Sequence, residues 1–332
     1  MKKLAVDVRG LVIFLTVVVL LMGTYLFVFG QEWQWLAFLR ILVASVGVSL
    51  VNKKLVSFEI AKAKSVFMAY FFCLFLASSF ALMVGQMAFD RSWLIVFVMG
   101  LFNGVAIRCN WMVTDMSQSR SSILKFWDDI IAMGLSYYIL NESQFMTSTV
   151  WWGMAFSLGA IILFVRHFHR KKISGKEYLP IYFFILIGVY SVIWGSVTFM
   201  ENYLAVEGVP PGKFLFGWYS GSFTMASVLL IFHIRKINKI GYVNNKEEAS
   251  YWQVALWGLF FSAGAALAIY LQFRTYSISP LVIVQPLFMV ADTIFPVLIG
   301  LFVFKEIKKV DRIEWLYFAI GLTGSMLIIS SY

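Results

Sequence analysis

Long apolar stretches separated by short polar segments make up almost the whole chain. A helix needs about 20 mostly apolar residues to cross the hydrocarbon core of a bilayer. By this measure we predict eleven membrane spans, at residues 11–30, 33–52, 65–88, 93–112, 117–140, 147–167, 179–200, 212–233, 251–273, 280–304 and 313–331. The pattern therefore predicts an all-α polytopic membrane protein with 10 or 11 transmembrane helices.

The segment 117–140 is the least obvious of these spans, because it contains Lys125, Asp128 and Asp129. If all eleven segments cross and the N-terminus is cytoplasmic, 22 basic residues lie on the cytoplasmic side and 3 on the other. Leaving 117–140 out of the count would move 13 of those charges to the wrong face. Because basic residues gather on the cytoplasmic side, we predict that 117–140 crosses. We expect an integral protein of the bacterial plasma membrane with a cytoplasmic N-terminus.

Composition excludes a soluble protein. Hydrophobic residues make up 61% of the chain and charged residues 13%, against about 25% charged in typical soluble domains. No polar stretch is long enough for a separate catalytic domain. Cys73 and Cys109 lie in apolar runs and are interpreted as small core residues rather than as a disulfide or metal site. With no phosphate-binding loop, nucleophile motif or metal spacing, we predict no cofactor, no metal and no enzymatic activity.

The chain repeats itself weakly. "WDDIIAMGLSYYILNE" (127–142) aligns with "ADTIFPVLIGLFVFKE" (291–306), which matches Asp128 to Asp292 and Glu142 to Glu306. This predicts a first five-helix repeat at 33–167, a basic linker at 168–178 and a second repeat at 179–332. Because each repeat has an odd number of spans, the two are inverted, as in many secondary transporters. Residues 1–32 then form an extra N-terminal helix; alternatively 11–30 belongs to the repeat and 65–88 is the addition.

Asp128, Asp129 and Asp292 fall near the middle of predicted spans. Charged groups at this depth are costly and usually face a cavity or a partner. They are candidates for binding a proton, a cation or the amine of a substrate. The alternative is a buried ion pair, formed by Arg108 with Asp128 or Asp129, with Arg40 paired to another residue. Since successive helix positions point about 100° apart, we expect only one of the two neighbouring aspartates to face the site.

Three other kinds of residue are candidates for the same site. Arg40 either extends to the outer interface or binds a substrate carboxylate through its guanidinium group. Gln285, followed by Pro286 and later Pro296, predicts a broken or kinked helix that makes 285–296 the favoured site segment. The remaining candidates are the deep tryptophans, which could stack on an aromatic or cationic solute: Trp127, Trp194 and Trp257.

Two further features are assigned structural roles. Glu201 and Asn202 fall at an outer helix end and are predicted to be interfacial. "GLFNG" (100–104) has the spacing of small residues that allows close helix contact, and packing is its favoured interpretation.

The C-terminal stretch "SPLVIVQPLFMVADTIFPVLIGLFVFKE", with the helix that follows it, resembles the last two helices of the drug/metabolite transporter superfamily, EamA-like branch. The matching features are Pro286 or Pro296, Glu306, and Gly321 with Gly324. "SVIWGSVTFMENY" (191–203) resembles the Trp-Gly helix that opens a repeat in this family. The first half departs from the pattern: Asp129 stands where a proline is common, and "LNE" replaces the usual Gly-Glu. The resemblance covers roughly 93–167 and 180–331.

The resemblance implies a ten-helix core that moves small organic solutes. We therefore expect a secondary-active transporter of amino acids, amines, drugs or related metabolites, coupled to a proton or cation and working by alternating access. Its expected partners are the solute and the lipid bilayer, without nucleic acid. The alternative is a polytopic membrane enzyme that uses Asp128 and Asp129 on lipid-linked substrates. A central cavity reached by Asp292 favours transport, whereas carboxylates gathered at one membrane face favour the enzyme.

Overall fold

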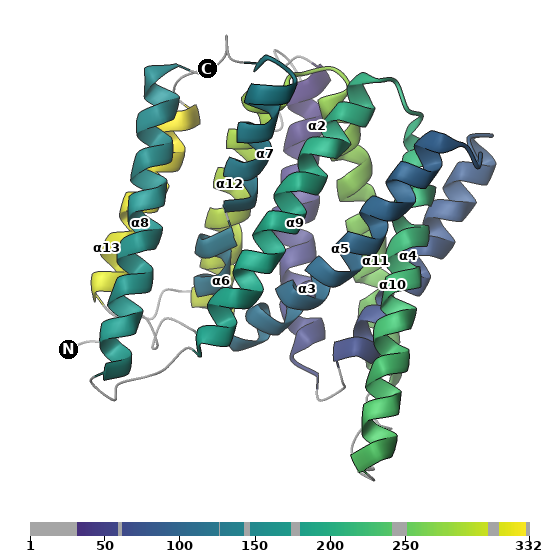
Figure 1. The fold of residues 1–332 in the computed structure, drawn as a ribbon, viewed down its shortest axis with the longest axis horizontal. Helices are drawn as coiled ribbons and strands as arrows, with labels where there is room; N and C mark the ends of the chain where they lie inside the picture. The colour runs from purple at the N-terminus through teal and green to yellow at the C-terminus, as the bar shows by residue number, and fades with distance from the viewer. Residues whose placement is uncertain are drawn as a thin grey trace.

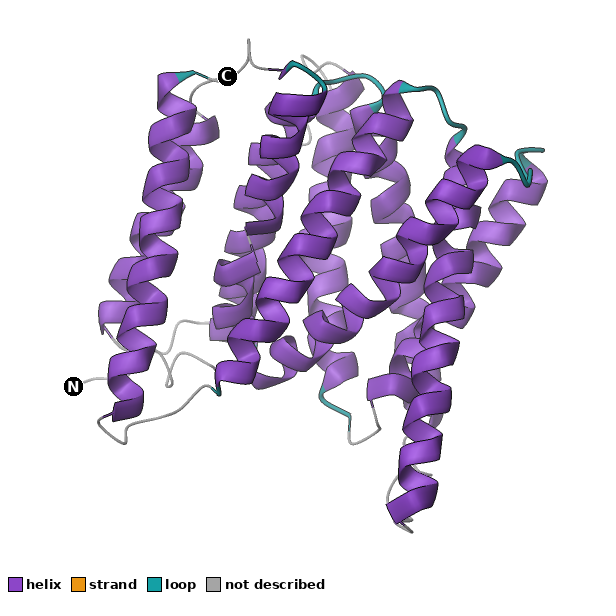
Figure 2. Cartoon of the chain, in the orientation of Figure 1, coloured by secondary structure: helices purple, strands orange, loops and turns teal. Residues whose placement is uncertain are grey.

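The structure is a computed structural model that describes residues 32–58, 62–125, 127–142, 147–173, 180–240, 251–304 and 312–329. Every long element within these ranges is a helix (Figures 1 and 2). The prediction of an all-α protein is confirmed for this part of the chain. The predicted span at 11–30 lies outside the described residues.

The helices follow one another with short connections. In the first half they are α2 (Glu32–Ile41), the π-helical segment η1 (Leu42–Val48), α3 (Ser49–Val56), α4 (Lys62–Met83), α5 (Arg91–Met116), α6 (Gln118–Lys125), α7 (Trp127–Ile139) and α8 (Ser148–Ile173). In the second half they are α9 (Ile181–Val206), α10 (Pro211–Ile240), α11 (Tyr251–Tyr276), α12 (Leu281–Leu298), the π-helical segment η4 (Ile299–Val303) and α13 (Arg312–Ile329).

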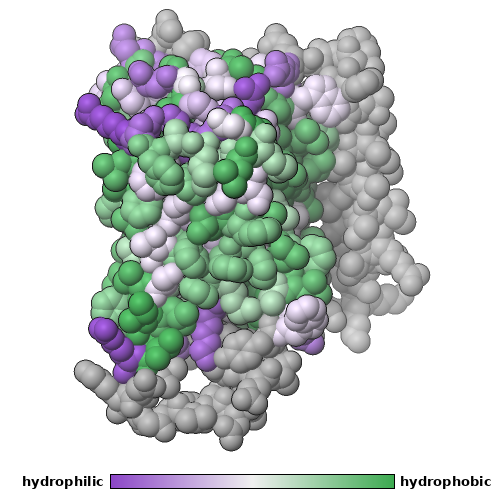
Figure 3. Space-filling view, turned by 90° about the vertical axis from the view of Figure 1, so that its right-hand side faces the viewer, coloured by the Kyte–Doolittle hydropathy of each residue, from purple (hydrophilic) through white to green (hydrophobic). Residues whose placement is uncertain are grey.

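Seven stretches of the described chain are long and apolar enough to cross a bilayer: Glu32–Val56, Ala63–Met83, Arg91–Met116, Ile181–Val206, Pro211–Arg235, Trp252–Tyr276 and Leu281–Val303. The surface agrees with this assignment, since Figure 3 shows a broad hydrophobic belt with hydrophilic residues gathered at its two ends. Large side chains such as Phe75, Trp152 and Phe232 are exposed. Exposure of these side chains to water would be unfavourable, whereas in a bilayer they contact the apolar lipid chains. The chain is an integral membrane protein.

The segment predicted as one span at 117–140 contains helices α6 and α7, and Phe126 between them lies outside the described residues. α6 ends at Lys125 and α7 begins at Trp127. Together they run from the face where α3 ends, the lower face of Figure 1, to the face where α12 begins, the upper face. The two helices therefore extend between the same two faces as the spans beside them, as the predicted crossing requires. Neither piece alone is long enough to count as a span.

Consecutive spans alternate in direction, so that the second half begins at the face opposite to the first: α2 starts at the upper face and α9 at the lower face (Figure 1). Corresponding helices of the two halves make corresponding contacts. α5 of the first half packs against α9, the first helix of the second half, and α11 of the second half packs against α2, the first helix of the first half. In the same way, α7 packs against α9, and α12 packs against η1, which continues α2. α8 and α13 pack against each other at the left edge of Figure 1.

The predicted break at 285–296 is not found. Pro286 and Pro296 both lie inside the continuous helix α12, and the irregularity follows them as η4. Pro296 has no N–H to donate to the carbonyl of Asp292, which weakens the ladder without ending the helix. A second π-helical segment, η1, interrupts the first span where the sequence has no proline.

The packing interpretation of "GLFNG" is confirmed. A Cβ atom added to Gly100 would come within 2.1 Å of the Trp218 carbonyl oxygen on α10, and one added to Gly104 within 2.7 Å of Met225 Cβ. The facing Gly221 is equally confined, because its Cβ would lie 2.0 Å from the Phe97 carbonyl oxygen. The backbones of α5 and α10 therefore touch, which only glycine permits.

Candidate functional site

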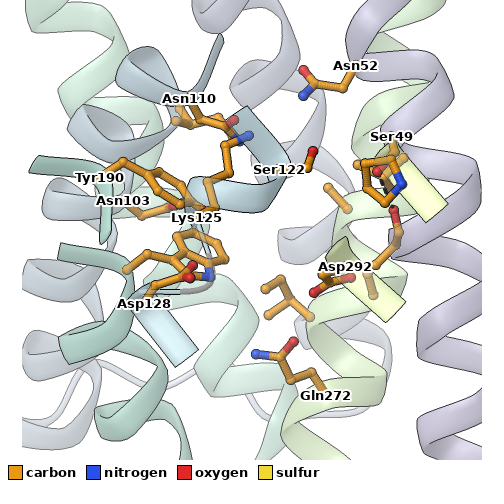
Figure 4. Close-up of a pocket in the computed structure, with 18 of the residues that line it drawn as sticks. Ser49, Asn52, Asn103, Asn110, Ser122, Lys125, Asp128, Tyr190, Gln272 and Asp292 are labelled. Carbon is orange, nitrogen blue, oxygen red and sulfur yellow. Dashed lines mark hydrogen bonds between the residues drawn. The ribbon is translucent and has the colours of Figure 1, made fainter. Parts of the chain in front are cut away.

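A cavity of about 200 Å³ lies between the two halves (Figure 4). Its wall combines residues of the first half, including Asp128 and Lys125, with residues of the second, including Gln272 and Asp292. Figure 4 places Asn52 and Ser122 toward one end and Gln272 at the other, with the charged groups between them. Thr114, which also lines the cavity, is the third residue from the end of α5 at the lower face, so the cavity reaches from the centre of the bundle toward that face.

Asp292 on α12 forms an ion pair with Arg40 on α2. Arg40 Nη1 lies 2.7 Å from Asp292 Oδ2 and 2.8 Å from Oδ1, and Ser45 donates a hydrogen bond to the same carboxylate. The Asp292 side chain is 37% exposed although it is in mid-helix. Since it faces the cavity, this carboxylate is available to a solute as well as to Arg40.

Arg40 is held by more than its ion pair. Its Nε donates to Gln272 Oε1 on α11 at 3.0 Å, and its guanidinium lies 4.2 Å from the centre of the Phe288 ring. Buried in this way, Arg40 does not extend to the outer interface as one interpretation proposed. Its guanidinium group, carried by α2, thus binds side chains of both α11 and α12 at the depth of the cavity.

Asp128, at the start of α7, faces the other side of the cavity. Figure 4 shows Lys125 and Tyr190 beside it, and Lys125 Nζ lies 5.6 Å from the centre of the Tyr190 ring. Lys125 also donates to Thr114 Oγ1 at 3.3 Å. Gly195 makes this arrangement possible, because a Cβ there would lie 2.5 Å from the Asp128 carbonyl oxygen. α9 therefore approaches α7 most closely where Asp128 enters the cavity wall.

Asp129 lines the same cavity, so the prediction that only one of the two aspartates faces the site is wrong. Both aspartates are buried near the start of α7, and both belong to the wall of the cavity. Asp129 Oδ1 accepts a hydrogen bond from Gln285 Nε2, and Gln285 Oε1 accepts one from the Tyr276 hydroxyl. An amide thus orients Asp129, whereas an arginine holds Asp292.

Of the predicted site residues, Arg40, Asp128, Asp129, Trp194, Gln285 and Asp292 line the cavity. Trp127 and Trp257 do not; both pack partly buried against the core. The predicted ion pair between Arg108 and an aspartate of α7 is not formed among the described residues. The ion pair at this depth is Arg40–Asp292.

Several polar residues of the site were not predicted from the sequence. The cavity wall includes Gln272, Tyr190 and Lys125, none of which was a candidate site residue. Glu201 and Asn202, predicted to be interfacial, are buried at 1% and 0% exposure. Gln272 could have been noticed as the amide in an otherwise apolar stretch of α11, but only packing shows what it contacts.

The charges of the wall do not balance. Asp128, Asp129 and Asp292 face only two cations, Arg40 and Lys125. With all five groups ionised, the wall carries one net negative charge. An unbalanced charge in a low-dielectric interior is costly, so the site favours a bound proton or a cationic group. Among the described residues, no group of three His, Cys, Asp or Glu residues could hold a metal ion.

A carboxylate outside the membrane connects the two halves at the upper face. Glu142, in the connection after α7, accepts a hydrogen bond from the Val282 N–H at 3.3 Å, in the first turn of α12. Burial raises the pKa of the Glu142 carboxyl group, and the N–H donors of α12 partly oppose the increase. Its predicted repeat partner, Glu306, lies outside the described residues.

No protein-family model and no curated protein sequence matches the chain. Nine chains of solved structures match its fold. One of them, described only as the crystal structure of a protein, is 12% identical with a TM-score of 0.60. The match covers 90% of this chain and 97% of that one. At this level of identity the similarity concerns the fold alone.

Proposed function

We propose that the chain is a secondary transporter of the drug/metabolite transporter type, which carries small organic solutes bearing an amine or other cationic group by alternating access. The observation that carries the proposal is the central cavity, walled by Asp128, Asp129 and Asp292 between two halves of opposite direction. An enzyme acting on lipid-linked substrates would instead need carboxylates gathered at one membrane face.

The recurring helix contacts support an inverted repeat within this proposal. Each half supplies a span that carries the site acids, α6–α7 in one and α12–η4 in the other. The aligned residues Asp128 and Asp292 contribute to one cavity. A site placed between two such halves can be exposed alternately to either face when one half rocks against the other.

The proposed solute places its cationic group between the aspartates and its apolar part against aromatic rings. Trp194 stacks parallel to Tyr190 with ring centres 5.9 Å apart, and both line the cavity. Such rings attract a cation through their faces. Because the cavity reaches the lower face, where the basic residues Lys53 and Lys54 end α3, we assign this conformation as open to the cytoplasm.

The test begins with purified protein and a panel of monoamines, amino acids, aromatic amines and quaternary ammonium ions, screened by thermal shift. We expect at least one cationic solute to stabilise the protein. Asp128→Asn should weaken its binding by about 10-fold or more, since a hydrogen bond to a charged group is worth about 1.5–3 kcal/mol. Asp90→Asn is the matched control, because Asp90 is exposed and pairs with Lys213.

Solutes that bind are then tested for flux in proteoliposomes. We expect accumulation driven by a solute or proton gradient in the wild type and in Asp90→Asn, and at least tenfold slower flux in Asp128→Asn. Binding without flux would contradict transport. Equal flux in both aspartate variants would contradict the assignment of the cavity.

A further inference from the structure

Glu201 is a buried acid that does not line the cavity, so solute binding in the cavity gives no reason for its burial. It lies on α9, five residues before the helix ends at Val206, which is roughly 7.5 Å along the axis at 1.5 Å per residue. Its side chain is 1% exposed, and among the described residues Oε1 has no hydrogen-bond partner. The neighbouring Asn202 is fully buried, with both side-chain polar atoms likewise unpartnered there. An isolated carboxylate at such a position is costly unless it binds a proton or a cation.

Glu201 is connected to the cavity through one amide. Gln272 Nε2 donates to Glu201 Oε2 at 2.9 Å, and Gln272 Oε1 accepts from Arg40 Nε at 3.0 Å. Arg40 in turn holds Asp292. Figure 4 shows Gln272 and Asp292 on the same side of the cavity. An arginine can only donate and an ionised carboxylate can only accept, so the two neighbours fix the orientation of the Gln272 amide.

This arrangement shares the charge of Arg40 between two acids. Asp292 contacts the guanidinium directly, and Glu201 acts on it through Gln272. When Glu201 is ionised, the set of Arg40, Asp292 and Glu201 carries one net negative charge and attracts a cation at Asp292. When Glu201 carries a proton, the set is neutral, and Arg40 is balanced by Asp292 alone.

The other titratable groups that face Glu201 are few. Arg40 acts on it from α2, Tyr219 from α10 and Tyr276 from α11. Both tyrosines are neutral phenols in the physiological range. Asp128 and Asp129 face the cavity from α7 and have their own response to pH, which the experiment must separate from that of Glu201.

We propose that Glu201 is a proton-binding site distinct from the solute cavity, and that its proton opposes cation binding at Asp292 through Gln272 and Arg40. The inference rests on the proposed function for its role in transport. The step is one of proton transfer only: a hydronium ion gives its proton to Oε1 of the carboxylate and becomes water, so that one O–H bond breaks as the other forms. Glu201 lies near the end of α9 at the upper face and the cavity extends toward the lower face, so the proposal has the two ligands approach from opposite sides. Such mutual exclusion produces exchange of protons for solute.

The coupling is reciprocal, as for any two linked ligands. We expect the affinity for a cationic solute found in the thermal-shift screen to be higher when Glu201 is ionised than when it is protonated. The expected ratio is about 5–150-fold, the usual range for coupled sites. Glu201→Gln, which imitates the protonated acid, should have the low affinity at every pH. Any pH dependence of the solute affinity that remains in this variant should come from Asp128 and Asp129 alone.

The first measurement does not require a solute. Infrared difference spectra of the wild type between acid and alkaline buffer should contain the C=O band of a protonated buried carboxyl group. We expect Glu201→Gln to lack this band. Glu32→Gln should retain it, because Glu32 is an exposed acid on the same face, 3.7 Å from Arg274. Gln272→Met removes the hydrogen bond to Glu201 and should shift the frequency of the band, which keeps the test valid if Glu201→Gln does not fold.

The second measurement is the pH dependence of cation binding in the same proteins. The proton site is rejected if no band is lost in Glu201→Gln or if none shifts in Gln272→Met. The coupling is rejected if Glu201→Gln and Glu32→Gln show the same pH dependence of binding. If no solute binds to the wild type, the proposed function fails, while the infrared spectra still decide whether Glu201 takes up a proton.

Discussion

At the scale of residues, the site contains acids at similar depth whose surroundings differ. Asp292 has an arginine, Asp129 has an amide, and Asp128 has a lysine and a phenol nearby. An arginine can only donate hydrogen bonds, whereas an amide can both donate and accept them, so Asp292 and Asp129 have partners of different chemistry. The three aspartates are therefore suited to different tasks within one cavity.

The ion pair of Arg40 and Asp292 gives a prediction about stability. Arg40→Met leaves the carboxylate of Asp292 without its cation inside the bundle. Breaking a fully buried pair in this way costs about 3–5 kcal/mol, and the 37% exposure of Asp292 makes the expected cost smaller. We expect a large loss of folded protein after heating in detergent, measured by size-exclusion chromatography. The double variant Arg40→Met with Asp292→Asn removes both charges and should recover most of the loss. If the loss in the double variant equals the sum of the losses in Arg40→Met alone and Asp292→Asn alone, the ion pair does not stabilise the fold.

Some residues of this site could be predicted from the pattern of polar and apolar residues in the sequence, and others could not. Asp128 and Asp292 could be predicted because a charge within an apolar span is conspicuous and costly. Tyr190 and Gln272 could not, since a tyrosine or an amide at such a position commonly faces lipid headgroups or packing neighbours. Glu201 was misplaced because counting residues to a helix end gives its depth in the membrane but not whether neighbouring helices cover it.

At the scale of elements, glycine positions decide how closely the helices approach. α5 and α10 meet at Gly100 and Gly221 with their backbones in contact, and α9 meets α7 at Gly195 beside Asp128. The spacing of small residues made the first contact predictable. The course of α12 was not predictable in the same way, because Pro286 and Pro296 are both buried within it and yet leave the helix continuous.

The crossing of α5 and α10 gives a second prediction. Gly221→Ala would bring a methyl group within 2.0 Å of the Phe97 carbonyl oxygen, a contact that only separation of the helices can relieve. We expect a strong decrease in the amount of folded protein recovered from membranes. Gly188→Ala on α9 is the control, because nothing lies within 4 Å of its Cβ and alanine favours helix over glycine. Equal recovery of both variants would mean that the contact tolerates a methyl group.

At the scale of the whole molecule, everything proposed for transport requires that α6 and α7 together cross the bilayer. This crossing sets the direction of every later span, and it lets Asp128 and Asp292 reach one cavity from helices that run in opposite directions. The charge distribution predicted it from sequence alone, because the basic loops after α8 and α10 would otherwise lie outside the cell. The cavity, by contrast, depends on side-chain contacts between the halves that no charge count contains.

The crossing can be tested by labelling single cysteines in a variant without Cys73 and Cys109, both of which are buried. Met116 and Ser148 are exposed and lie at opposite ends of the α6–α7 segment (Figure 1). We expect a membrane-impermeant maleimide added to intact cells to modify Ser148→Cys but not Met116→Cys. In inverted vesicles the result should be reversed, because basic residues keep the end of α5 on the cytoplasmic side. Modification of both cysteines from one side would place the two ends on the same face. The two halves would then no longer be inverted, and the aspartates of α7 and α12 would have no reason to share a cavity.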